Sequence, residues 1–153
     1  MRKFLYSVAV LSMVSAGSLA AQTRSDIEVL RQELKTDRQA VVAKNMKLTD
    51  AQATAFWPVY RAYQAEMAAV GDKFIKLLEG YGKKYDTMKD PDAEALIKDY
   101  IDLQQSKLKI QNDYVSKFKK VVPATAVARY YQIENKIDAI INLELAAGIP
   151  LVK

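Results

Sequence analysis

The chain has 153 residues, carries a formal net charge of +5 and contains neither cysteine nor histidine. Without cysteine it can form no disulfide and cannot be attached to a lipid through a cysteine. Without histidine it lacks the usual general base, the usual haem ligand and the commonest transition-metal ligand, which disfavours redox chemistry and most enzyme mechanisms. We therefore predict a protein that is not an enzyme, with no catalytic residues, no metal and no cofactor.

The N-terminus has the layout of a secretory signal. Arg2 and Lys3 precede an apolar stretch at residues 4–14, and small residues follow at 16–18, 20 and 21. The apolar stretch is shorter than the about 20 residues that a membrane-spanning helix needs. We predict a cleaved signal peptide over residues 1–20, an exported single domain over residues 21–153, and no membrane span.

Two helices are predicted in the first half of the exported domain. The first is capped by Thr23 or Ser25 and ends near Asn45 or Lys47. It carries an apolar stripe, which Asp37 interrupts and which consists of Ile27, Leu30, Leu34 and Val41. The second runs from Asp50 towards Tyr85. Thr49 and Gln52 have the spacing of a capping box, in which each side chain bonds the other residue's backbone amide. Pro58 predicts a kink near residues 54–58, and Gly80 and Gly82 predict a frayed end.

The second helix carries an apolar stripe at alternating spacings of four and three residues, namely Phe56, Tyr60, Tyr63, Met67, Val70, Phe74, Leu77 and Tyr81. Such a stripe faces a neighbouring helix, so it predicts a helical hairpin, a bundle or a homodimer. Tyrosine has a polar tip that seeks water or a partner, which suggests a half-exposed stripe. The candidate protein-binding surface is Phe56, Tyr60, Tyr63, Met67, Phe74 and Tyr81. The alternative is that these side chains merely pack between helices.

Two further helices complete the chain. Asp90-Pro91 marks the start of the third, with Asp90 as its cap, and Lys119-Lys120 marks its end. Its two adjacent apolar stripes predict contact with two neighbours. Pro123 separates it from a fourth helix, which Gly148 and Pro150 terminate. The second helix alone would be roughly 50 Å long, so we expect an all-α, elongated helical hairpin or four-helix arrangement.

The charged residues point to no particular ligand. The lysines of the second and third helices alternate with carboxylates, which is typical of a solvated face and not of a nucleic-acid site. Asp90, Asp92 and Glu94 lack the glycine and the distal glutamate of a calcium loop. No isolated pair of carboxylates suggests acid–base chemistry.

The segment Leu48-Thr49-x-x-Gln52, at the start of a long helix in a small exported chain, resembles the LTxxQ-motif proteins of the Spy and CpxP type. The resemblance implies a bent helical hairpin that dimerises, and a periplasmic role as an ATP-independent chaperone or envelope-stress modulator. Leu48, Thr49 and Gln52 match the motif. The partners would be unfolded or envelope proteins. Two alternatives remain: a structural or adaptor protein with one specific envelope partner, and a small-ligand carrier or enzyme, which would need a deep pocket with converging polar groups.

Overall fold

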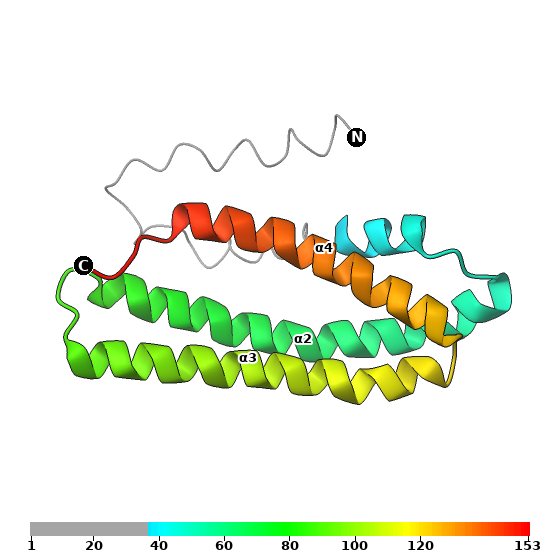
Figure 1. The fold of residues 1–153 in the computed structure, drawn as a ribbon, viewed down its shortest axis with the longest axis horizontal. Helices are drawn as coiled ribbons and strands as arrows, with labels where there is room; N and C mark the ends of the chain where they lie inside the picture. The colour runs from blue at the N-terminus through cyan, green and yellow to red at the C-terminus, as the bar shows by residue number, and fades with distance from the viewer. Residues whose placement is uncertain (1–36) are drawn as a thin grey trace.

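The computed structural model describes residues 37–153. They form a helical segment at 37–45, α2 (Asp50–Lys84), α3 (Asp90–Lys119) and α4 (Ala124–Gly148), with no strand in this part of the chain. Figure 1 shows α2 and α3 side by side and antiparallel, with α4 returning along the other side of α2 and the segment 37–45 close to α4. The all-α, elongated arrangement is therefore as predicted. The predicted start of the first helix lies outside the described residues, as does the signal peptide.

The start of α2 is set by the predicted capping box. The Thr49 hydroxyl accepts a hydrogen bond from the Gln52 amide at 3.3 Å, and the Thr49 amide donates to the Gln52 side-chain oxygen at 3.0 Å. Both bonds satisfy backbone donors that have no partner within the helix. The helix then continues through the exposed Pro58 and past Gly80 and Gly82 to Lys84, one residue before the predicted Tyr85.

The start of α3 differs from the prediction by one residue. Asp90 is the first helical residue, and Lys89 occupies the cap position in its place. The Lys89 amide donates to the Asp92 carboxylate at 3.3 Å. A carboxylate in the first turn also suits the positive end of the helix dipole. The end of α3 at Lys119 and the end of α4 at Gly148 agree with the sequence.

The core is a cluster of aromatic rings between α2, α3 and α4. Phe118 and Tyr130 have ring centroids 4.7 Å apart, and Tyr63 packs edge-on against Tyr114 at 5.3 Å. Val42, and not the predicted Val41, is the buried residue of the segment 37–45. The buried members of this cluster are Val42, Met46, Phe56, Tyr60, Tyr63, Tyr114, Phe118, Val122, Val127 and Tyr130.

The tyrosine stripe is therefore mostly buried within the chain. Phe56, Tyr60 and Tyr63 are at most 3% exposed. Aromatic rings bury large apolar areas, and edge-to-face contacts between them add stability. Tyrosine can therefore occupy core positions where leucine is the more usual residue. For Phe56, Tyr60 and Tyr63, the structure supports the alternative in which these side chains pack between helices.

Candidate functional site

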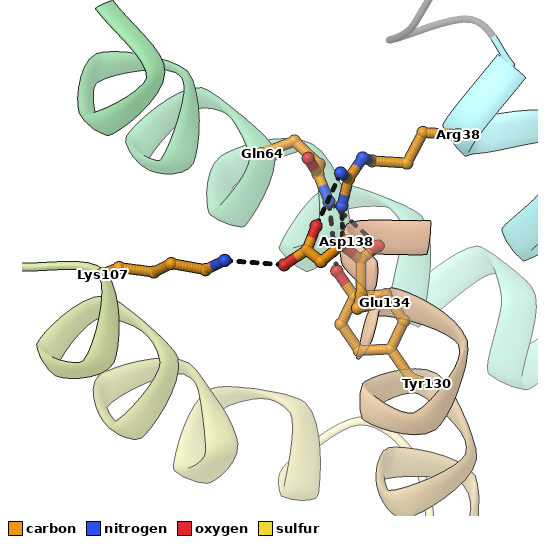
Figure 2. Close-up of polar contacts among 6 residues, drawn as sticks. All are labelled: Arg38, Gln64, Lys107, Tyr130, Glu134 and Asp138. Carbon is orange, nitrogen blue, oxygen red and sulfur yellow. Dashed lines mark hydrogen bonds and ion pairs between the residues drawn. The ribbon is translucent and has the colours of Figure 1, made fainter. Parts of the chain in front are cut away.

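A buried polar network joins three parts of the fold (Figure 2). Arg38, from the segment 37–45, contacts two carboxylates of α4: one guanidinium nitrogen donates to Glu134, and the other donates to Asp138 at 2.8 Å. Lys107 of α3 donates to the second Asp138 oxygen at 2.7 Å. The network thus ties the N-terminal segment and α3 to the same turn of α4.

Gln64 of α2 completes the network. Its side-chain nitrogen donates to Glu134 at 3.2 Å and lies 3.3 Å from the Tyr130 hydroxyl, which accepts from it. Glu134 is only 4% exposed. A buried carboxylate needs hydrogen-bonding or charged partners, and Gln64 and Arg38 supply them here. Each helical part of the described chain therefore contributes one or more polar side chains to this cluster.

The pKa values of the two carboxylates shift in opposite directions, although burial acts to raise both. Burial raises the pKa of Glu134 above its ordinary value of 4.5, and the charge and hydrogen bonds of Arg38 offset this only in part. Burial also acts on Asp138, but the hydrogen bonds and charges of Lys107 and Arg38 outweigh it, so the pKa of Asp138 falls below 3.8. Burial and the Glu134 charge raise the pKa of Tyr131 to about 12. The cluster is therefore most stable with Asp138 ionised.

The composition of this cluster suits a structural clamp better than a catalytic site. Two cationic side chains face two carboxylates, and the donors and acceptors are engaged with one another. A general acid or base would need a proton that can reach a substrate. A closed, charge-balanced cluster instead fixes the relative positions of the elements that supply it.

Sequence reasoning missed this cluster, although the sequence carries a signal for it. Arg38 continues the stripe of Leu34 at a spacing of four residues, and Glu134 follows Tyr130 at the same spacing. Lys107 likewise follows the buried Leu103. Charged residues at core positions on different helices suggest that they pair, but their spacing alone does not show which residues do so.

A second feature is an open groove between the far ends of α2 and α3. Its volume is about 460 Å³. Its apolar lining comes from both helices and the turn between them, namely Leu77, Tyr81, Met88, Ala95, Leu96 and Leu103. The rims carry opposite charges: lysines on α2 and aspartates on α3, namely Lys73, Lys76, Lys84, Asp92, Asp99 and Asp102.

The groove retains one member of the predicted protein-binding surface. Tyr81 lines it, and its hydroxyl donates to the Pro150 carbonyl at 2.7 Å, which fixes the C-terminal segment at this end of the molecule. Phe56, Tyr60 and Tyr63 lie in the core instead, while Met67 and Phe74 are half-buried. The predicted surface is therefore not one continuous exposed face in this structure.

Comparison with known proteins adds no assignment: the chain matches no protein-family model, no curated protein and no solved structure. The likeness to the LTxxQ-motif proteins thus rests on Leu48, Thr49 and Gln52, which lie at or just before the start of α2 and do not line the groove between α2 and α3. Within residues 37–153, no helix has the length and apolarity that crossing a membrane requires.

Proposed function

We propose that this chain is an exported, periplasmic protein-binding protein without catalytic activity, which holds apolar polypeptide segments in the groove between α2 and α3 independently of nucleotide. The groove is the observation that carries the proposal. Its lining offers Leu77 and Leu96 to an apolar side chain, and it also contains Lys84 and Asp92, which form an ion pair with each other. Residues 1–20 support the export that the proposal requires.

The groove suits weak and tolerant binding. Fully burying one large apolar side chain contributes about 1.5–3 kcal/mol, whereas a dissociation constant of 1 mM corresponds to about 4 kcal/mol. Two captured side chains would therefore give affinities near the millimolar range. Rims that carry both charges do not select strongly for acidic or basic segments. A protein with these properties can retain unfolding chains briefly and release them without an energy source, as a chaperone-like protein does.

The experiment is aggregation suppression by the purified, processed chain. Two unrelated denatured proteins of opposite net charge are diluted into buffer that contains the chain at about 1 mM, the concentration that the expected affinity requires, without nucleotide, and light scattering is followed. The proposal predicts reduced scattering for both clients. An inert protein at equal mass concentration is the control. Unchanged scattering for both clients would overturn the proposal.

A structural or adaptor role with one specific envelope partner is the second candidate. The extensive aromatic core and the clamp around Arg38 favour it, because both give a rigid scaffold. It predicts no effect on either denatured client, together with saturable binding of one envelope protein. The same scattering experiment therefore separates the two functions.

A further inference from the structure

The groove between α2 and α3 is long and is walled by side chains of two helices. Its lining extends over residues 73–84 of α2 and 92–106 of α3. At 1.5 Å per residue, these stretches are about 17 Å and about 21 Å long. Both stretches lie in helices, where backbone amides and carbonyls bond to one another. A polypeptide in the groove therefore meets side chains, and it cannot add a strand to a sheet there.

A helical partner suits such walls better than an extended one. An extended polypeptide needs hydrogen-bond partners for its amides and carbonyls, which these apolar walls do not supply. A helix bonds its own backbone groups and presents apolar side chains at spacings of three and four residues along one face. The length of the groove matches about three turns of such a helix.

Gly80 makes one part of the lining shallow. No glycine of the described chain has a positive φ, so the backbone at Gly80 does not require glycine, and glycine inside a helix is less favourable than alanine. A Cβ at Gly80 would meet no atom of another element within 4 Å, so the packing of the chain does not require glycine either. The missing side chain instead lets the backbone of a partner approach α2 closely.

The groove faces away from α4. Gln64, which bonds to Glu134 of α4, is 16 residues before Gly80, so the two positions are about 160° apart around α2. The lining includes no described residue of α4. A helix can therefore occupy the groove without displacing α4 from the aromatic core.

The two rims offer charges of opposite sign to a partner. Lys84 and Asp92 pair with each other at one end of the groove. Lys73 and Lys76 on α2 and Asp99 on α3 are exposed and form no ion pair with any residue of the described chain. A helix between these rims meets cations on one edge and a carboxylate on the other, so complementary charges on its two edges would favour binding.

We propose that the groove takes an amphipathic helix of about three turns, with acidic side chains on the edge that faces α2 and basic side chains on the edge that faces α3. The apolar stripe of this helix contacts Leu77 and Leu96, and its backbone passes over Gly80. This inference rests on the proposed function and specifies its partner: the polypeptide segments that the groove holds are helical when bound.

The first experiment compares two synthetic peptides of about 12 residues and identical composition. One is an all-L amphipathic sequence with glutamate on one edge and lysine on the other, and its diastereomer has two central D-residues, which break the helix. Each is titrated into the full chain, expressed so that export can process it, up to about 5 mM, and NMR chemical shifts are followed. The all-L peptide should bind at least about tenfold more tightly, because only it can form the helix.

The outcomes of this titration separate the two proposals. Equal binding of the two peptides, or tighter binding of the diastereomer, would overturn the helical partner and leave the proposed function standing. Binding of neither peptide would overturn both. Circular dichroism of the complex should show added helical signal with the all-L peptide, and its absence despite binding would also contradict a helical partner.

The second experiment tests where the peptide binds. Gly80→Phe should weaken binding of the all-L peptide at least about tenfold, because the new ring fills the space that the partner occupies. Gly71→Phe is the matched control: an added Cβ at Gly71 likewise meets no atom of another element within 4 Å, but this residue of α2 does not line the groove. Circular dichroism checks that both variants remain helical. Equal effects of the two variants would overturn the proposal.

The third experiment tests the charges of the two edges. The native chain should bind the all-L peptide more tightly than a version with glutamate on both edges. Asp99→Lys makes both rims basic and should reverse this order. The difference should shrink at about 0.5 M salt, where exposed charges are screened. The same order for both proteins would contradict the assignment of the edges.

Discussion

The Arg38 guanidinium donates to the Asp138 carboxylate at 2.8 Å, which joins two residues that are 100 positions apart in the chain. The same guanidinium contacts Glu134, one turn earlier on α4. The contact anchors the segment 37–45 on α4. Because α4 also carries Tyr130 into the aromatic core, the anchor is continuous with the packing that holds α2 and α3 together.

Removal of Arg38 should destabilise the fold strongly. Arg38→Ala leaves Glu134 buried without its cationic partner, and breaking a largely buried ion pair in this way costs about 3 kcal/mol. The free energy of unfolding, from urea denaturation followed by circular dichroism, measures the effect. Arg61→Ala is the control, because Arg61 is exposed on α2 and its loss should cost at most about 0.5 kcal/mol. Equal losses for the two variants would contradict the clamp.

The pH dependence of stability should contain two opposite contributions from α4. The pKa of Asp138 is lowered in the folded chain, so its stabilising contribution is present above 3.8 and is lost as the pH falls below that value. The pKa of Glu134 is raised, so its contribution is greatest below 4.5 and is lost as the pH rises through the raised pKa.

Single variants separate these contributions in urea unfolding measured from pH 3 to pH 8. Asp138→Asn should be less stable than the native chain at neutral pH and should lose less stability in acid. Glu134→Gln should lack the decline that begins above pH 4.5 in the native chain. Identical pH profiles for all three proteins would show that the network contributes nothing to the pH dependence.

Tyr63 should act on folding and not on binding. It is 1% exposed and contacts four other rings, those of Tyr114, Phe118, Tyr130 and Tyr131. Tyr63→Ala should therefore lower the free energy of unfolding by about 3–5 kcal/mol, as the removal of a buried aromatic ring does. Phe74→Ala, at a half-buried position of the same stripe, should cost about 1–2 kcal/mol in the same denaturation experiment. If Phe74→Ala lowered the free energy of unfolding more than Tyr63→Ala does, the placement of Tyr63 in the core would be contradicted.

Local signals in the sequence were sufficient for most of the helices. Thr49 and Gln52 fix the start of α2, and Pro123 and Gly148 bound α4, because capping and helix termination depend on a few neighbouring residues. The cap of α3 is Lys89 and not the predicted Asp90, because the Asp92 carboxylate accepts the Lys89 amide and the helix already begins at Asp90.

Contacts between residues on different helices could not be predicted from such local signals. Tyrosine at a stripe position is compatible with burial or exposure, and the difference at Tyr60 depends on whether another helix covers it. Arg38 and Glu134 are 96 positions apart in the chain, so they can pair only when the helices that carry them meet in the fold. The groove, too, is lined by residues of both α2 and α3, and no local pattern encodes how these two helices pack together.

Site-specific photo-cross-linking tests most directly whether polypeptides bind in the groove. The chain lacks cysteine, so Ala95→Cys in the groove and Ala139→Cys on α4, both exposed positions, can each carry a single thiol-linked photoprobe. Each labelled protein is irradiated with a denatured client. We predict strong capture of the client at position 95 and little at position 139. Equal capture at both positions, or capture only at 139, would contradict binding in the groove.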